Sequence, residues 1–191
     1  MTRLILCCAS ILISFLVHPA QGQETFSPDA GRAFVVTELG AQGDGIANDT
    51  KALQTAINAC AKAGGGRVVV PAGKYLMGAI RLRSNVELHL AEEARLVGVD
   101  DLDAYLGFES GDWGKGRWNR ALIIGEGLRN IAITGEGTID GNQVFDPKGE
   151  AGMRGPHTVL LSDCENVTLK DVTIRDSANY AFFFYRSINF V

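Results

Sequence analysis

Apolar and polar residues alternate in short runs along this chain, and one pattern of alternation occurs three times. Asn85, Asn130 and Asn166 each open a run in which Val, Ile or Leu alternates with polar or charged residues, until a Gly, Asp or Asn ends it. Such alternation predicts short strands separated by turns. A looser copy of the last run follows around Asn189, 23 residues after Asn166. Repetition at this period predicts a solenoid, in which each coil buries its apolar face only by stacking on the next.

Alternation outside the three copies predicts the remaining strands of these coils. The predicted strands are 34–36, 67–78 (strand, turn and strand), 80–82, 86–90, 121–124, 131–134, 137–141, 158–161, 167–174 and 180–185. Residues 39–50 are rich in Gly and end in polar residues, which predicts a loop. In 86–90, Glu87 and His89 alternate with Val and Leu, so we expect both side chains on the solvent face.

One segment has helical rather than strand periodicity. Residues 50–63 follow three residues that can cap a helix and precede three consecutive Gly, which end it. The apolar positions at helical spacing are Leu53, Ala56, Ile57, Cys60 and Ala63. An amphipathic helix ahead of the strands is well placed to cover the open end of a solenoid, whose first coil would otherwise expose apolar surface and unpaired strand edges.

The N-terminus predicts export. Residues 1–22 contain an early Arg, an apolar run and small residues placed as in a cleavage site, so we predict a secretory signal peptide and a secreted or periplasmic protein. Residues 23–33 are predicted to be a linker, and 34–191 one domain. The apolar run is too short to cross a bilayer and no later run approaches the required length, so no membrane span is expected.

Composition and charge exclude several classes of partner. The chain is 46% hydrophobic and 21% charged, as in ordinary globular proteins, and its net charge of −4 comes from scattered acids. Nothing in this distribution indicates nucleic acid or an anionic membrane surface as a partner. An acidic protein can still bind an acidic polysaccharide through a locally basic groove. No cofactor is predicted, and we expect a monomer.

Two cysteines, Cys60 and Cys164, remain after removal of the signal peptide. They could pair in an oxidising compartment. We favour two buried thiols, since Cys60 falls on the apolar face of the helix and Cys164 beside a strand. Neither has a Cys or His at the spacing of zinc ligands, and no metal site is predicted.

An insertion at residues 99–120 interrupts the repeat and contains both Trp residues, Trp113 and Trp118. Aromatic rings on such a loop can stack on the apolar face of a sugar, or fold back to cover the solenoid. Acidic residues surround them without the spacing of a calcium loop.

A second irregular segment, 145–157, carries Lys148, Arg154 and His157. It is the most basic local stretch near a coil face. Its cations could contact carboxylates on a ligand, or the segment could be a solvated loop. The predicted substrate-binding residues are therefore Trp113 and Trp118 together with Arg154 and His157.

Several runs resemble the N-terminal third of the polygalacturonase-like glycoside hydrolases of family 28, in the pectin-lyase-like superfamily. The runs are LGAQGDG from Leu39, NDTKALQ from Asn48, ACAKAGGGRVVVPAGKY from Ala59, LRSNVELHL from Leu82, GTIDG from Gly137 and DCENVT from Asp163. They cover about residues 34–175. They are more specific for the superfamily than for one activity, because related lyases, epimerases and phage tailspikes share the opening run.

The resemblance implies an all-β, right-handed parallel β-helix and hydrolysis of pectic, galacturonan-type chains with inversion, without a metal. That chemistry uses one carboxylic acid and one carboxylate base about 6.5 to 9.5 Å apart. The family's catalytic motifs lie beyond the coil that begins near Ile188, and Asp140 matches a structural turn. No catalytic residue is therefore assigned, and we expect the chain to be an incomplete, inactive N-terminal portion of such an enzyme. Two alternatives are a calcium-dependent polysaccharide lyase and a non-catalytic carbohydrate-binding or adhesion module.

Overall fold

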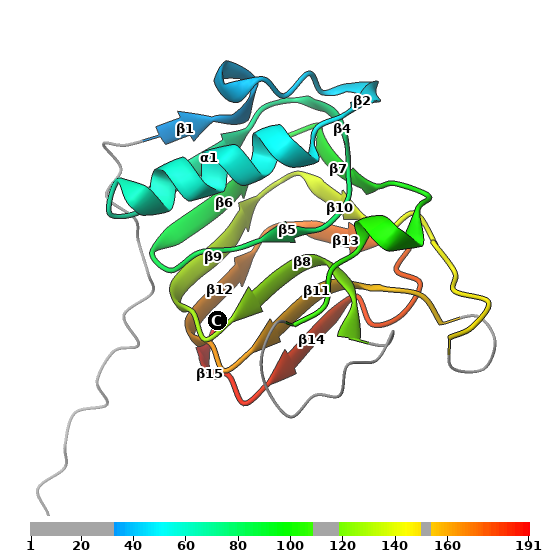
Figure 1. The fold of residues 1–191 in the computed structure, drawn as a ribbon. Coiled ribbons are helices and arrows are strands. Elements are labelled where there is room, and N and C mark those ends of the chain that lie inside the picture. The colour runs from blue at the N-terminus through cyan, green and yellow to red at the C-terminus, as the bar shows by residue number, and fades with distance from the viewer. Residues whose placement is uncertain (1–32, 109–118, 150–153) are drawn as a thin grey trace, which may run out of the picture.

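The computed structural model describes residues 33–108, 119–149 and 154–191. These residues form three parallel sheets that wind into a right-handed parallel β-helix, which confirms the fold that the resemblance implies (Figure 1). No helix in this part of the chain has the length and apolarity needed to cross a bilayer. The signal peptide predicted at 1–22 and the linker up to residue 32 lie outside the described residues and stay predictions.

Each coil passes through sheets A, B and C in turn. Sheet A contains β1 (Ala33–Val35), β3 (Gly66–Val70), β6 (Val86–Leu90), β9 (Arg129–Gly135), β12 (Glu165–Lys170) and β15 (Ile188–Phe190). Sheet B contains β2 (Asp44–Asn48), β4 (Gly73–Met77), β7 (Ala94–Gly98), β10 (Thr138–Asp140) and β13 (Thr173–Arg175). Sheet C contains β5 (Ile80–Arg81), β8 (Ala121–Glu126), β11 (His157–Ser162) and β14 (Phe182–Tyr185).

The core consists of apolar side chains stacked in register from coil to coil. In sheet A the inward row is Val68, Leu88, Ile133 and Leu169. In sheet B it is Tyr75, Leu96, Ile139 and Ile174. In sheet C it is Ile80, Ile123, Val159 and Phe182. Every second residue of these strands therefore points into the interior, where it stacks on the corresponding residues of the neighbouring coils. Burial of each such apolar side chain stabilises the fold by about 1.5–3 kcal/mol.

The Asn residues that open the repeats form a ladder at the corner between sheets C and A. Asn85, Asn130, Asn166 and Asn189 all adopt left-handed backbone conformations, with φ between 54° and 62°. Each side-chain amide donates to the Oδ1 of the Asn one coil earlier, at 2.9 Å in all three steps. Asn tolerates this conformation better than other non-Gly residues, and here its amide also joins successive coils.

The predicted helical cap is confirmed. Helix α1 (Thr50–Lys62) lies across the N-terminal end of the solenoid and packs on β1, β3, β5, β6 and the short 3-10 helix η1 (Val36–Leu39) (Figure 1). Leu53, Ala56, Ile57 and Cys60 are fully buried on its inner face. The cap therefore covers the apolar surface of the first coil.

Cys60 and Cys164 are both buried and form no disulfide within the described part of the chain, as the sequence predicts. Cys164 lies between β11 and β12, and burial raises the pKa of its thiol.

Two predicted segments have different boundaries in the structure. The expected loop at 39–50 contains strand β2, which pairs with β4 at the edge of sheet B. The Gly-containing sequence does not predict a strand here, because the hydrogen bonds that stabilise it come from parallel pairing with β4. The expected strand at 167–174 is instead two strands, β12 and β13, because Asp171 has a φ of 65° and turns the chain from sheet A to sheet B.

Glu87 does not face solvent as predicted, since it is only 3% exposed. Its Oε2 accepts from Arg67 Nε at 2.7 Å, and its Oε1 accepts from Thr134 Oγ1 at 2.5 Å. His89 is partly exposed, and its Nδ1 lies 2.9 Å from Thr134 Oγ1. Neighbouring strands thus provide the partners that a buried carboxylate requires.

Candidate functional site

The long connections of successive coils gather on one flank of the solenoid. In the three coils that begin at β6, β9 and β12, the connections from sheet B to sheet C span 99–120, 141–156 and 176–181, whereas those from A to B span two or three residues each. In Figure 1 the described parts of these connections lie on the same side of the solenoid, beyond the ends of β10 and β13. We call them the loop flank. Because each belongs to a different coil, stacking of the coils places residues far apart in sequence side by side.

The described parts of the loop flank bond to one another. Gln143 N donates to Asp176 O at 2.8 Å, and Asn179 Nδ2 donates to Gly155 O at 3.2 Å. Thr158 N and Gly155 N donate in turn to Tyr180 O and Ala178 O. These bonds fix the backbone of the connection 141–156 against that of 176–181.

A short 3-10 helix, η2 (Leu102–Ala104), orders the described start of the connection 99–120. Asp101 Oδ1 accepts from Asp103 N at 3.0 Å and caps this helix. Tyr105 OH donates to Val99 O at 2.9 Å. Burial, with smaller contributions from Asp100 and Asp101, raises the pKa of the Tyr105 phenol well above its usual range.

An aromatic stack lies where the loop flank meets sheet C. The Tyr180 ring is nearly parallel to the His157 ring, at 6° with 5.6 Å between centroids, and Phe183 contacts both. Tyr180 is 49% exposed, whereas His157 is 1% exposed. The Arg154 guanidinium lies over the Tyr180 ring, 5.7 Å from its centroid. An exposed ring and an adjacent cation therefore form the outer surface, and His157 lies beneath them.

Two of the four predicted binding residues fall within the described part of the chain. Arg154 is exposed on the loop flank. His157 begins β11 and is buried under Tyr180, so we assign it a supporting position behind the surface. Trp113 and Trp118 lie outside the described residues. Tyr180 was not among the predicted binding residues, because it adjoins the aromatic run of β14 and was included in the predicted strand 180–185. The turn-forming residues at 176–179 are the signal that could have separated Tyr180 from that strand.

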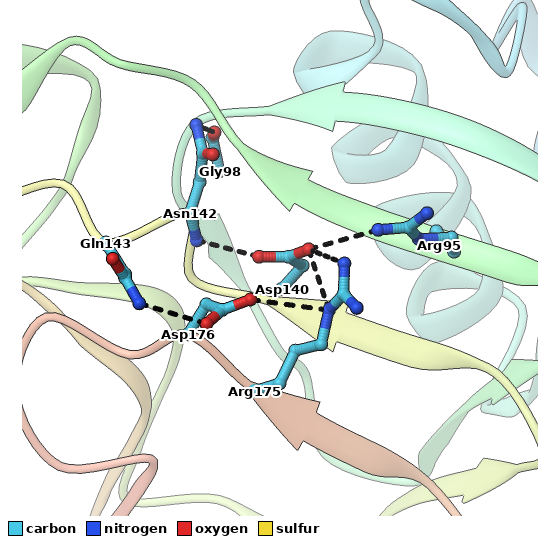
Figure 2. A network of polar contacts seen from close by, with 7 residues as sticks. All are labelled: Arg95, Gly98, Asp140, Asn142, Gln143, Arg175 and Asp176. Carbon is cyan, nitrogen blue, oxygen red and sulfur yellow. Dashed lines mark hydrogen bonds and ion pairs between the residues drawn. The ribbon is translucent and has the colours of Figure 1, made fainter.

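A second polar cluster lies on the outer face of sheet B, around Asp140 (Figure 2). Asp140 Oδ2 accepts from Arg175 Nη2 at 2.6 Å, Arg175 Nε at 2.9 Å and Arg95 Nη2 at 3.2 Å. Asp140 Oδ1 accepts from Asn142 N at 2.9 Å. We call Arg95, Asp140, Asn142 and Arg175 the Asp140 network.

Opposing effects set the protonation of Asp140. Burial would raise the pKa of this carboxyl, but the hydrogen bonds from Arg175, from Asn142 N and from Arg95 outweigh it and hold the pKa below its usual value. The same pairing raises the pKa of Arg175. Asp140 is therefore ionised at neutral pH and serves as a fixed anion that orients two guanidinium groups from different strands.

The sequence of this chain is similar to those of several known proteins. Residues 33–90 match the family described as rhamnogalacturonase A/epimerase, pectate lyase-like. The chain is 28% identical over 208 residues to the exo-poly-alpha-D-galacturonosidase of Dickeya chrysanthemi, covering 82% of this chain and 34% of that protein. It is 33% identical over 157 residues to alginate lyase 7 of Azotobacter vinelandii, covering 77% of this chain and 17% of that protein. This chain thus spans about a third or less of these relatives.

The fold also has a counterpart in a solved structure. The family 28 exopolygalacturonase of Yersinia enterocolitica aligns with a TM-score of 0.70 at 27% identity, covering 86% of this chain and 37% of that chain. The similarity therefore extends over nearly the whole described solenoid, well beyond the segment that matches the family model.

Proposed function

We infer that this chain, which belongs to the pectate-lyase-like superfamily of parallel β-helix proteins and resembles its family 28 glycoside hydrolases, binds an acidic plant-type polysaccharide along its loop flank. The proposed ligand class is a pectic chain of the galacturonan type. The relatives support a carbohydrate-active protein similar to polygalacturonases. They include both hydrolases and a lyase, so the reaction is proposed on further grounds.

The observation that carries this proposal is the Arg154–Tyr180 pair on the loop flank. A half-exposed aromatic ring can stack on the apolar face of a sugar. A guanidinium beside it can donate two parallel hydrogen bonds to a carboxylate. A uronic acid unit offers both features at once, a ring face and a carboxylate. The stacking of Tyr180 on His157 and Phe183 holds the ring in place before the sugar arrives.

We propose hydrolysis with inversion as the reaction of the family member to which these coils belong. Inversion needs two carboxyl groups about 6.5 to 9.5 Å apart, and parallel strands about 4.8 Å apart offer such spacings at small multiples. Among the catalytic motifs that the resemblance to family 28 implies, Asn-Thr-Asp, Gly-His-Gly and Arg-Ile-Lys do not occur in the 191 residues. We therefore expect this chain by itself to bind galacturonan without turning it over.

A binding measurement tests the proposal. We expect hexagalacturonate to bind the wild-type chain in isothermal titration calorimetry at pH 7, and Tyr180→Ala and Arg154→Gln each to weaken binding about 10-fold, equivalent to about 1.4 kcal/mol. Tyr180→Phe keeps the ring and should keep most of the affinity. Arg129→Gln, which removes an exposed cation from sheet A, is the matched control. Equal affinities for the wild type, Tyr180→Ala and Arg154→Gln would refute the loop flank as the site.

The same samples distinguish the reactions. Release of reducing ends without absorbance of an unsaturated product would show hydrolysis, and calcium-dependent release of unsaturated products would favour the lyase alternative. Binding with neither product agrees with our expectation for this chain and also with the binding-module alternative. A longer chain that contains these coils and the three missing motifs distinguishes the hydrolase hypothesis from the binding-module hypothesis. Only the hydrolase hypothesis predicts that this longer chain cleaves galacturonan.

We also propose that the protein is exported and acts as a monomer. The predicted signal peptide at 1–22 motivates the first part. N-terminal sequencing of extracellular or periplasmic protein should begin near residue 23, and light scattering should give the mass of one chain.

A further inference from the structure

We propose that the outer face of sheet A carries a binding site for a linear aliphatic polyamine, whose ammonium groups bind around the imidazole of His89. The site is a pocket of about 530 Å³ at the ends of β6, β9 and β12, and its polar lining includes His89, Glu92, Thr134, Glu136, Lys170 and Asp171. It shares no residue with the loop flank or the Asp140 network, and it goes beyond the proposed function, so either proposal can fail without the other.

A chain of hydrogen bonds across three strands fixes the tautomer of His89. Glu87 is 3% exposed, and its carboxylate accepts from Arg67 on one oxygen and from the Thr134 hydroxyl on the other. Because Thr134 has one hydroxyl proton and gives it to Glu87, its oxygen can only accept from His89 Nδ1, which lies 2.9 Å away. Neutral His89 therefore bears its proton on Nδ1 and keeps a lone pair on Nε2.

The Nε2 atom of His89 is an oriented acceptor in this pocket. The His89 side chain is 31% exposed, and its Nε2 has no hydrogen-bond partner within the described part of the chain. A Cβ on Gly135 would lie 3.1 Å from His89 Cε1, so the lack of a side chain at Gly135 leaves room for the ring. An ammonium group carries three donors and no acceptor, and it therefore suits an imidazole whose lone pair is held in place before binding.

The charges of the lining favour a cation. The carboxylates of Glu92 and Glu136 are exposed and have no ion pair with any described residue. With His89 neutral they leave the lining two negative charges in excess, because each of its two cations is already paired with a carboxylate. Solvated surface acids would account for Glu92 and Glu136, but not for the buried carboxylate that orients His89 in the same pocket. The two ion pairs are Arg67–Glu87 at 2.7 Å and Lys170–Asp171 at 4.0 Å.

The carboxylates are spread along the solenoid axis, which favours a long cation over a compact one. Glu92 follows β6, Glu136 follows β9 and Asp171 follows β12, so each of three successive coils has a carboxylate at its turn from sheet A to sheet B. Since neighbouring strands lie about 4.8 Å apart, this row extends over roughly 10 Å. Among the described residues, no three His, Cys, Asp or Glu side chains are placed to hold a metal ion. Ammonium groups separated by methylene chains fit such a row.

Isothermal titration calorimetry at pH 8 and low salt tests the site, with spermidine as the probe and triethylene glycol as a neutral chain. One test variant, Glu92→Gln/Glu136→Gln, removes the unpaired carboxylates, and the other, His89→Ala, removes the imidazole. The control Glu38→Gln/Asp103→Asn removes the same charge as the first from η1 and η2. We expect each test variant to lose affinity for spermidine by about 5-fold and the control to change by less than about 2-fold. Triethylene glycol should not bind.

The nitrogen signals of the imidazole give a second readout, which needs no variant to fold. Long-range proton–nitrogen correlation spectra of the wild type should show His89 protonated on Nδ1, and spermidine should shift its Nε2 signal while the signals of the buried His157 stay in place. A proton on Nε2 in the free protein, or an Nε2 signal that saturating spermidine does not move, would overturn the site.

The remaining outcomes separate a built site from a general attraction of cations to an acidic protein. An equal loss of affinity in the test and control variants would overturn the proposal, and so would displacement of spermidine by Mg²⁺ at equal charge concentration. Tyr180→Ala should bind spermidine as the wild type does, because that ring is on the loop flank. Thermal unfolding of each variant verifies that a loss of binding is not a loss of fold.

Discussion

The Asn ladder allows a prediction that separates side-chain hydrogen bonding from backbone conformation. Asn130 donates to Asn85 Oδ1 and accepts from Asn166 Nδ2, both at 2.9 Å, and its φ is 54°. Asn130→Ala removes two hydrogen bonds and also places a Cβ without a compensating polar group in the left-handed region. Asn130→Gly removes the same bonds but has no steric cost at positive φ.

The magnitudes follow from the partial exposure of the ladder. Water replaces the lost partners, so each bond is worth about 0.5 kcal/mol, the low end of the usual range. Left-handed backbone costs Ala about 1–2 kcal/mol, which gives about 2–3 kcal/mol in total for Asn130→Ala. Asn130→Gly loses about 1 kcal/mol of bonding and about 0.4–1 kcal/mol through the freer unfolded chain. We therefore expect Gly to be less destabilising than Ala by about 0.5–1 kcal/mol.

Urea unfolding followed by circular dichroism measures these differences. With a slope of about 2 kcal/mol per molar, Asn130→Ala should lower the midpoint by about 1–1.5 M and Asn130→Gly by somewhat less than 1 M. Asn189→Gly, at the end of the ladder, loses a single bond and should cost less than Asn130→Gly. The reasoning is refuted if Gly is as destabilising as Ala at position 130, or if Asn189→Gly costs as much as Asn130→Gly.

Three further predictions concern the fold. Because the pKa of Asp140 is depressed in the folded state, its ionised carboxylate stabilises the fold at pH values above the pKa of an unfolded Asp, about 4. The stability advantage of the wild type over Asp140→Asn should therefore shrink as pH falls from 5 to 2. An advantage that grows on acidification would contradict the pairing of Asp140 with Arg175 and Arg95. Gly135 has a φ of 100° and a Cβ there would overlap Leu90 O, so Gly135→Ala should cost more than about 3 kcal/mol in urea unfolding, whereas Gly127→Ala, with open space around it, should cost about 1–2 kcal/mol. Cys60 and Cys164 are buried, so Ellman's reagent should react with them in urea and only slowly in the native protein; rapid native reaction would show that the core around them opens.

The candidate sites were predicted from sequence only where one residue carried the signal by itself. Arg154 was proposed as a binding residue because it lies in a basic segment without strand periodicity. The Asp140 network could not be found this way, because Arg95 and Arg175 lie 45 and 35 residues from Asp140 and meet it only across strands of sheet B. Glu87 was placed in solvent for the same reason, since Arg67 and Thr134 reach it from neighbouring coils.

The sequence alone determined the repeating coil, the helix that caps it and the Asn turns that open its repeats. Alternation of apolar residues, helical spacing in 50–63 and the preference of Asn and Gly for positive φ are local properties, and they act whatever the chain contacts later. Only the tertiary structure decided which strands share a sheet, that the described parts of the connections 99–120, 141–156 and 176–181 lie on one flank, and which charged side chains become partners. These features depend on how many residues each coil takes to return to its starting corner, because that count sets the register in which distant segments stack.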